Sequence, residues 1–276
     1  SMAKVIDAEV LLVPTETAMC RADIEKVVSG LTPEQKERLF AVVATGGTTN
    51  AGIIDDLEGV ADYCEKHSLW FHVDAAYGGG ALAAPSVRAL FNGIERSDSI
   101  TIDPHKWLFS PYDCGAVIYK KPELAKEAHA QEGSYLDIFK DEGAAGFNPS
   151  DYQIQLTRRL RGLPLWFSLA MHGTAKYEWA VEQGISLALE AASLIKIADH
   201  VELVIEVNLS CVIFRRKGWT AEDYKEWTYQ NLEKKFALVT PTKFLHQGTM
   251  ETVARFCFIN PDTTRQDISD ILDTML

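Results

Sequence analysis

Short apolar runs alternate with amphipathic stretches through the first half of the chain. Apolar runs occupy residues 39–45, 69–73, 99–102 and 114–119. Between the first two runs, one helical face collects Leu57, Val60, Ala61 and Cys64. This rhythm predicts an open, mainly parallel β-sheet flanked by helices, which is an α/β fold. The unbroken run at 39–45 predicts a strand that is buried on both faces.

Turn and helix-cap residues predict further elements before residue 39. Residues 9–13 predict a strand that Pro14 closes, and residues 22–28 predict a helix. Thr32, Pro33 and Gln35 form the pattern of an N-cap, a proline at the first helical position and a capping box. A further helix is therefore expected to begin at Pro33.

The second half of the chain has a different pattern. Residues 163–198 are strongly helical, with an expected break near Gly173 or Gly184. Beyond about Glu202, the pattern predicts strands at 203–207, 210–216, 236–240 and 252–259, a helix capped by Thr220, and a last helix with Ile268, Ile271 and Leu272 on one face. We therefore expect a large domain over residues 1–198 and a smaller α+β domain over residues 199–276.

Composition narrows the classes of function. The net charge of −12 argues against nucleic acid or an anionic membrane as the main partner, because both require a basic surface. No apolar run approaches the roughly 20 residues of a membrane span, and the first residues lack the apolar core of a signal peptide. The five cysteines are scattered without a CxxC pair, which excludes neither a metal site nor a disulfide but favours reduced, mostly buried thiols in a cytoplasmic protein. No residue is assigned to a metal.

Two short motifs carry the chemistry. Asp74 ends an apolar run and begins DAAYGG, and Lys106 follows 32 residues later within DPHKW, just past the next run. A carboxylate that emerges from a buried strand needs a cationic partner, and a lysine amine can hold an aldehyde as a Schiff base. Pyridoxal 5′-phosphate offers both a protonated pyridine ring and an aldehyde. The pair predicts a pyridoxal phosphate enzyme with Lys106 as the Schiff-base residue and Asp74 as the partner of the ring nitrogen.

Neighbouring residues are expected beside this cofactor. Thr45 ends its strand at a glycine-rich turn, where it reaches the ring oxygen or a substrate carboxylate, or serves the turn alone. Ala76 is small enough for a flat ring to lie against the backbone. Asp103 and His105 flank the cofactor position, and His105 could contact phosphate or transfer a proton.

Two assignments stay open on the residues alone. His72 either holds Asp74 in place or is a satisfied core histidine. The pair Arg158-Arg159 either binds an amino-acid carboxylate through bidentate contacts or forms a surface pair at a helix start.

Four blocks of the chain resemble one family. VATGGTTNAG, FHVDAAYGGG, DSITIDPHKW and QLTRRLRGLPLWF follow the order of the group II pyridoxal-phosphate decarboxylases, which include aromatic-amino-acid, glutamate and diaminobutyrate decarboxylases. The similarity is strongest over residues 41–173 and extends more weakly to both ends. The joint presence of DPHKW and HVDAAYGG makes the match specific.

The resemblance implies a fold of the aspartate-aminotransferase type and a homodimer with active sites at the subunit interface. It implies cofactor contacts for Lys106, Asp74, Ala76, Thr45, Asp103 and His105. Thr157 would match a backbone position that reaches the phosphate bound by the other subunit. Arg158 would match the residue that binds the substrate α-carboxylate.

Two departures from the family pattern bear on function. Family members are much longer, and residues 1–4 resemble the stretch just after a ring-stacking histidine, so the chain is expected to be a fragment. The family also carries a loop tyrosine that reprotonates the substrate. Counting back from Arg158 puts its position near Gly143, and the nearest tyrosines are Tyr135 and Tyr152. His105 is an alternative proton donor.

The leading hypothesis is decarboxylation of an L-amino acid to the amine and CO2. One alternative is another reaction on the same cofactor, by an aldehyde synthase, a lyase or an aminotransferase. The other is a non-catalytic fragment that acts as a dimerisation piece. The sequence of the QLTRRLRGLPLW block mildly favours an aromatic substrate over an acidic or diamino one.

Overall fold

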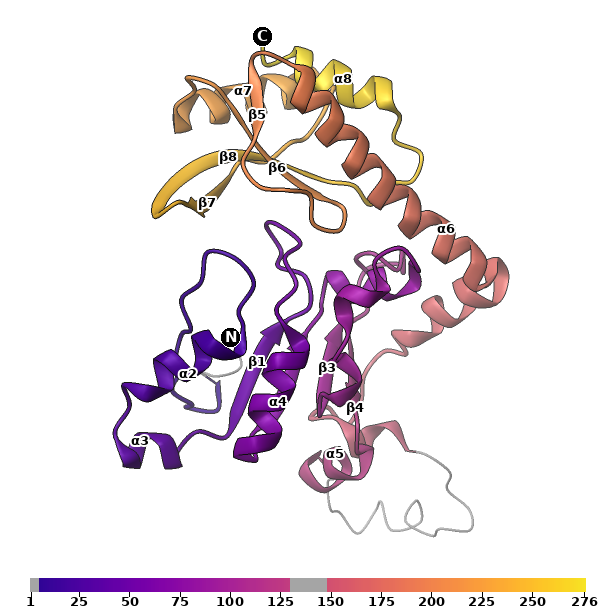
Figure 1. Ribbon diagram of the computed structural model, residues 1–276. Coiled ribbons are helices and arrows are strands. Elements are labelled where there is room, and N and C mark those ends of the chain that lie inside the picture. Colours follow the sequence, from indigo (N-terminus) through magenta and orange to yellow (C-terminus); the bar gives the residue numbers. More distant parts are fainter. Residues whose placement is uncertain (1–4, 130–147) are drawn as a thin grey trace.

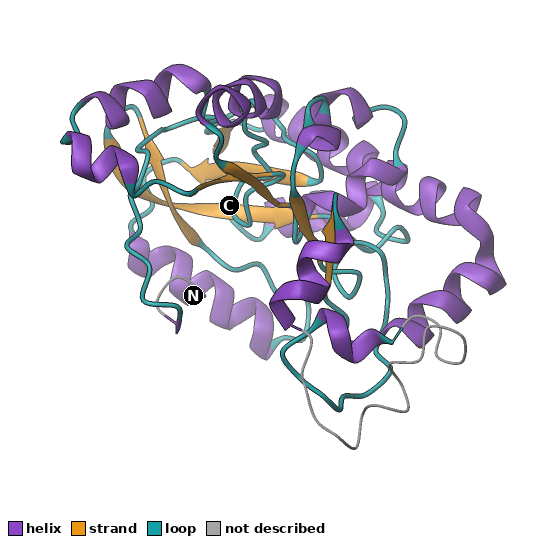
Figure 2. Ribbon diagram, turned by 90° about the horizontal axis from the view of Figure 1, so that it is seen from below, coloured by secondary structure: helices purple, strands orange, loops and turns teal. Residues whose placement is uncertain are grey.

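The computed structural model describes residues 5–129 and 148–276. These residues contain two four-stranded sheets, and the long helix α6 (Gly162–Ile197) runs along one side of the molecule from the first sheet to the second (Figure 1). A view from below shows helices on both sides of the strands (Figure 2). Within this part of the chain, no helix is both long and apolar enough to cross a membrane.

The first sheet is mainly parallel, as predicted. Its strands, in spatial order, are β1 (Ala41–Thr45), β2 (Trp70–Asp74), β3 (Ser99–Ile102) and β4 (Ala116–Tyr119). The pairs β1–β2 and β2–β3 are parallel, and β4 returns antiparallel to β3. Helix α4 (Leu57–His67) makes the crossover from β1 to β2, and its predicted apolar face is buried in the core beside the sheet.

Shorter helices border this sheet. They are α2 (Arg21–Ser29), α3 (Pro33–Glu37) and α5 (Pro122–His129), with 3-10 turns η1 (Gly78–Ala83), η2 (Arg88–Phe91), η3 (Ile94–Arg96) and η5 (Pro149–Tyr152). The predicted capping box is confirmed at α3, because Thr32 Oγ1 accepts a hydrogen bond from the N–H of Gln35 and the Gln35 side chain accepts one from the N–H of Thr32.

Two predictions for the start of the chain are wrong. Residues 9–13 form no strand, and β1 is not buried on both faces, since the Val43 side chain is 59% exposed. Among the described residues, β1 pairs only with β2 and forms an edge of the sheet. Residues 9–13 lie instead along an apolar cavity of about 770 Å³ that Val43 also lines. An apolar run shows that a segment avoids water, but not that a neighbouring strand is there to pair with it.

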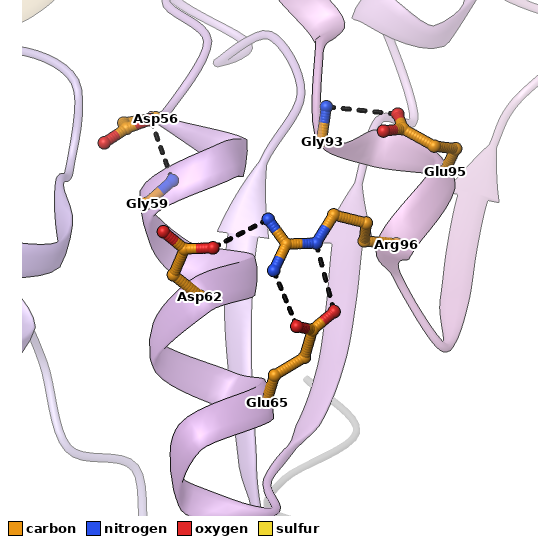
Figure 3. A network of polar contacts seen from close by, with 7 residues as sticks. All are labelled: Asp56, Gly59, Asp62, Glu65, Gly93, Glu95 and Arg96. Carbon is orange, nitrogen blue, oxygen red and sulfur yellow. Dashed lines mark hydrogen bonds and ion pairs between the residues drawn. The ribbon is translucent and has the colours of Figure 1, made fainter.

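An arginine fixes α4 to the turn that precedes β3. Arg96 reaches Asp62 at 2.8 Å and Glu65 at 2.7 Å, and it is 28% exposed (Figure 3). The hydrogen bond from Arg96 holds the pKa of Glu65 below its ordinary value. Next to it, Gly93 adopts a φ of +95°, and an added Cβ would lie 2.6 Å from the backbone nitrogen of Glu58.

The second sheet is antiparallel throughout. Its strands, in spatial order, are β5 (Val201–Leu203), β6 (Cys211–Arg216), β8 (Thr249–Cys257) and β7 (Thr242–His246). Helices α7 (Ala221–Glu233) and α8 (Arg265–Asp273) pack on it together with the second half of α6. Thr220 caps α7 as predicted, and Ile268 and Leu272 of α8 are buried. The proposed division into domains at residues 198 and 199 stays a prediction.

Two of the strands predicted in this half are misplaced. Residues 204–207 and 236–240 are not strands, and β5 and β7 lie just outside them. Pro241 has no N–H to donate to a sheet, so β7 begins only after it. Helix α6 breaks at Gly173, where φ is 70° and ψ is 164°. Gly184 remains helical, and its lack of a side chain serves contact, because a Cβ there would lie 2.6 Å from the Phe258 carbonyl oxygen.

The turn after β2 depends on a close approach between two backbones. A Cβ on Gly78 would overlap the Gly46 carbonyl oxygen and would lie 3.0 Å from the Cα of Gly47. We expect Gly78→Ala to lower the free energy of unfolding by about 3 kcal/mol, since backbone on both sides must move. The matched control is Gly162→Ala, where nothing lies within 4 Å. Urea unfolding of both variants measures the difference, and an equal midpoint would contradict the close approach.

Candidate active site

The parallel strands bring their carboxyl ends together at one edge of the first sheet. Thr45 and Asp74 are the last residues of β1 and β2 and are direct register partners. Asp74 is in turn paired with Thr101 of β3, so Asp103 and Lys106 follow immediately beyond the same edge. In open α/β sheets this edge is where ligands bind.

The Asp74 carboxylate points out of the sheet without a cation beside it. Its Oδ1 accepts a hydrogen bond of 3.1 Å from the N–H of Ala76, and no lysine, arginine or histidine of the described residues forms an ion pair with it. The turn is anchored to β3, because Ala75 N–H donates to the Thr101 carbonyl and Asp103 N–H donates to the Ala76 carbonyl, each at 3.0 Å. The carboxylate is therefore held in place and available to an external cation.

Lys106 lies on the turn after β3, where its amine is accessible. Its Nζ is 2.8 Å from Asp103 Oδ2, and the Lys106 side chain is 40% exposed. The next residue, Trp107, is fully buried and stacks on the Tyr77 ring, with ring centroids 5.1 Å apart and planes 5° apart. A buried indole beside an accessible amine fixes the backbone of Lys106 while the side chain can still react.

The His105 ring is oriented by the loop that precedes β4. The Cys114 N–H donates to His105 Nδ1 at 3.0 Å, and the Tyr112 ring contacts it edge-on with centroids 4.9 Å apart. In the neutral ring the proton is therefore on Nε2, which leaves that nitrogen as a donor.

Thr45 is tied down by an aspartate that sequence reasoning missed. Asp55 Oδ2 accepts a 2.7 Å hydrogen bond from the Thr45 N–H, and Oδ1 accepts one of the same length from the N–H of Met19. Burial raises the pKa of Asp55, and these two hydrogen bonds oppose the rise. No local motif marks Asp55, because its partners become neighbours only when β1 and the segment around Met19 fold against each other.

His72 forms its hydrogen bonds with β3 rather than with Asp74. Its Nδ1 is 2.7 Å from Ser99 Oγ and its Nε2 is 3.2 Å from Thr101 Oγ1. Burial lowers the pKa of His72, while the negative charge of Asp74 opposes that shift. The geometry favours the satisfied histidine over a residue that holds Asp74, since hydroxyl groups engage both ring nitrogens.

A second aspartate, Asp113, holds the segment that contains Arg158 through the neighbouring arginines. Asp113 Oδ1 accepts a 2.6 Å contact from Arg159 Nη2, and Asp113 Oδ2 accepts a 3.1 Å contact from Arg161 Nε. Partial burial raises the pKa of Asp113, but its backbone hydrogen bond and the two guanidinium groups hold that pKa below its ordinary value. Asp113 directly precedes Cys114, which contacts His105, so this pairing connects the arginine segment to the histidine loop. Sequence reasoning missed it because 46 residues separate Asp113 from Arg159.

The structure brings some of the predicted residues together and leaves others apart. Thr45, Asp74, Ala76, Asp103, His105 and Lys106 share one edge of the first sheet. Thr157 and Arg158 are exposed, and no ion pair links Arg158 to Asp74 or to Asp103. Gly143 and Tyr135 lie outside the described residues. Within the described ranges, no group of three His, Cys, Asp or Glu side chains could hold a metal ion.

The chemistry of this edge fits pyridoxal phosphate. An accessible lysine suits the aldehyde, and an unpaired carboxylate held on a rigid turn suits a protonated ring nitrogen. The small Ala76 and the Gly46-Gly47 turn leave backbone close to the site without bulky side chains.

Lowering the pH should destabilise the fold through His72. Its pKa is lowered in the folded state, so its contribution to stability is present above the ordinary histidine pKa of about 6.5 and is lost as the pH falls through the folded value. Urea unfolding at about pH 7.5 and about pH 5.5 should show a smaller loss in His72→Gln than in the parent chain. The exposed His67→Gln is the matched control. An equal loss in the parent and in His72→Gln would contradict the assignment.

Comparison with known proteins shows which family the chain resembles. The model of the pyridoxal-dependent decarboxylase conserved domain matches residues 1–217. An aromatic-L-amino-acid decarboxylase from Bacillus atrophaeus is 31% identical over 271 residues, which cover 92% of this chain and 56% of that protein. An L-2,4-diaminobutyrate decarboxylase from Acinetobacter baumannii is 36% identical over 208 residues, which cover 75% of this chain and 40% of that protein. The chain thus spans about half the length of the curated relatives it matches.

A solved structure shows the same fold. The crystal structure of Oryza sativa TDC with PLP and tryptamine has a TM-score of 0.86 and 26% identity, covering 99% of this chain and 59% of that one. The expected α/β fold of the aspartate-aminotransferase type is confirmed, and so, at the level of the family, is the expected cofactor. Because the family match spans most of the chain, the conclusion is that this chain belongs to the pyridoxal-dependent decarboxylase family.

Proposed function

We propose that the protein containing this chain decarboxylates an L-amino acid to the corresponding amine and CO2, with pyridoxal 5′-phosphate bound covalently by Lys106. The observation that carries the proposal is the unpaired Asp74 carboxylate and the accessible Lys106 amine at the carboxyl ends of adjacent parallel strands. Membership of a decarboxylase family supports the type of reaction.

Lys106 and Asp103 form the reactive pair of this proposal. A lysine amine attacks an aldehyde only after it loses its proton, and Asp103 lies 2.8 Å from the Lys106 nitrogen in position to accept it. Asp74 holds a proton on the ring nitrogen across the adjacent strand. The bound cofactor then supplies an acceptor for the electron pair that remains when CO2 departs.

His105, Thr45 and Ala76 orient the reactants. His105 presents its Nε2 proton, since Nδ1 is engaged by the Cys114 N–H, and it can donate that proton to phosphate or to the substrate α-carbon. Thr45 offers a hydroxyl at the end of β1, and Ala76 leaves room for a flat ring over the turn after β2.

Arg158 is the proposed binding residue for the substrate carboxylate. Its neighbours Arg159 and Arg161 both pair with Asp113, whereas Arg158 forms no ion pair with a described acidic residue. A free guanidinium can bind a carboxylate through two parallel hydrogen bonds. The named relatives act on aromatic amino acids and on diaminobutyrate, and the proposal gives a mild preference to an aromatic substrate.

The proposal includes a homodimer in the cytoplasm. The first half of α6 exposes several large apolar side chains, which are those of Leu163, Trp166, Phe167, Leu169 and Met171. Clustered exposed apolar groups of this size favour burial against another protein surface. In such a dimer Thr157, just before this helix, would approach the phosphate bound by the other subunit. Five free cysteines support a reducing compartment.

The decisive experiment traps the cofactor on the chain. The 276-residue protein is mixed with pyridoxal phosphate, reduced with borohydride and mapped by peptide mass spectrometry. We expect the adduct on Lys106 and its loss in Lys106→Ala, because the amine is the only atom of that side chain that can bond the aldehyde. The exposed Lys36→Ala is the matched control and should keep the adduct.

Other outcomes of that experiment separate the alternatives. An adduct that persists in Lys106→Ala would reject the assignment of this lysine. A folded chain that takes up no cofactor would favour the dimerisation piece. Where turnover is measurable, amine with an equal amount of CO2 supports decarboxylation, whereas aldehyde with ammonia indicates an aldehyde synthase.

The dimer is tested on the surface of α6. Trp166 is 60% exposed among these apolar side chains, and Trp166→Glu places a charge there. We expect this variant to shift the mass measured by light scattering from dimer towards monomer, since an unpaired charge in a buried interface is costly. Leu189→Glu, on the second half of the same helix and 56% exposed, should leave the mass unchanged. A monomeric parent chain would contradict the dimer.

A further inference from the structure

Two thiols face each other across the second sheet. Cys211 on β6 and Cys257 on β8 are direct register partners, and their sulfur atoms lie 3.9 Å apart. None of the five cysteines forms a disulfide, and the other three are Cys20, Cys64 and Cys114. Cys211 is 1% exposed, whereas Cys257 is partly exposed.

The backbone around the pair already has the geometry of a cross-strand disulfide. The Phe258 N–H donates to the Ser210 carbonyl at 2.9 Å, so residues 210 and 258 are a hydrogen-bonded pair. The next pair along, Cys211 and Cys257, is therefore a non-hydrogen-bonded pair, in which Cα atoms approach to about 4.5 Å. Disulfides span Cα separations of about 4.4–6.8 Å. We therefore expect side-chain rotation to bring the sulfurs from 3.9 Å to the bond length of about 2.05 Å.

The polar groups around the sulfurs give them different characters. Arg255 stands two residues before Cys257 on the same strand face, its Nε is fixed by the Asn50 carbonyl at 2.9 Å, and its Nη2 is 4.0 Å from Cys211 Sγ. The hydrogen bond from Cys211, followed by the charge of Arg255, lowers the pKa of Cys257 to about 6 against the opposing effect of burial. The same hydrogen bond and burial raise the pKa of Cys211. Peroxide can therefore reach Cys257, which is partly exposed and whose pKa is lowered, whereas Cys211 is buried beside it.

We propose that Cys257 and Cys211 form a peroxide-reactive thiol pair, in which Cys257 attacks the peroxide and Cys211 closes a reversible disulfide. The Cys257 thiolate displaces hydroxide from hydrogen peroxide and becomes a sulfenic acid, and a proton converts that hydroxide to water. Cys211 sulfur then attacks the Cys257 sulfur, the S–OH bond breaks, and the hydroxyl leaves with the Cys211 proton as a second water. Two thiols and one peroxide thus give one disulfide and two waters.

The pair is linked to the core beneath Lys106. Cys211 Sγ lies 3.6 Å from the Tyr77 hydroxyl, and Tyr77 stacks on Trp107. Disulfide formation removes the Cys211 proton and draws the Cys211 sulfur towards Cys257. Oxidation therefore changes a contact one aromatic layer away from the candidate active site.

The test follows the thiols themselves and needs neither cofactor nor substrate. The reduced chain is treated with hydrogen peroxide, its remaining thiols are alkylated, and the peptides are mapped without reduction. We expect one linked pair of peptides, joining Cys211 to Cys257, that disappears after thiol reduction. Cys20→Ser is the matched control and should still form it.

Two single variants resolve the order of the steps. Cys211→Ser should stop at the sulfenic acid of Cys257, which dimedone labels, because the second thiol is absent. Cys257→Ser should leave Cys211 unlabelled by dimedone and free to be alkylated after unfolding. The proposal is overturned if Cys20 becomes oxidised while the linked peptides stay absent, or if dimedone labels Cys211 in Cys257→Ser.

Discussion

The parallel pairing of β1, β2 and β3 is the constraint on which the candidate site depends. Register places Thr45 beside Asp74 and Asp74 beside Thr101, so three chain segments leave the sheet at the same edge. A slip of one residue would turn the Asp74 side chain to the other face, since side chains alternate along a strand. The hydrogen bonds between His72 and the hydroxyl groups of Ser99 and Thr101 oppose such a slip, because they join β2 to β3 through side chains as well as backbone.

The turns that carry the reactive residues are supported from the second half of the chain. Tyr77 stacks on Trp107, and its hydroxyl lies 2.6 Å from Ser210 Oγ at the start of β6. Gly184 of α6 brings helix backbone against the Trp107 indole, 3.3 Å from the position of an added Cβ. Lys106 is therefore positioned by contacts between the two sheets as well as by β3 itself. This explains why a residue with an accessible amine has a fully buried neighbour.

The sequence predicted the elements and site residues that depend on interactions between residues close together in the chain. The apolar runs gave β2 and β3 to within a residue, and the Thr220 cap gave the start of α7. The strand expected at residues 236–240 failed because an apolar run does not show where a partner strand lies. Asp74 and Lys106 could be predicted because each lies at the end of an apolar run or just past it. Asp55 and Asp113 were not, since each acts on residues that only tertiary folding brings near.

The net charge of the whole chain does not by itself decide which ligand binds at the candidate site. A net charge of −12 would repel a phosphate or an amino-acid carboxylate at long range. Fields between exposed charges are screened beyond about 8 Å in physiological salt, so most of those acidic residues do not act at the site. Asp113 carries one negative charge and pairs with both Arg159 and Arg161, whereas Arg158 forms no ion pair with a described acidic residue. Under the proposed function, Arg158 is therefore the guanidinium that remains available to a substrate carboxylate.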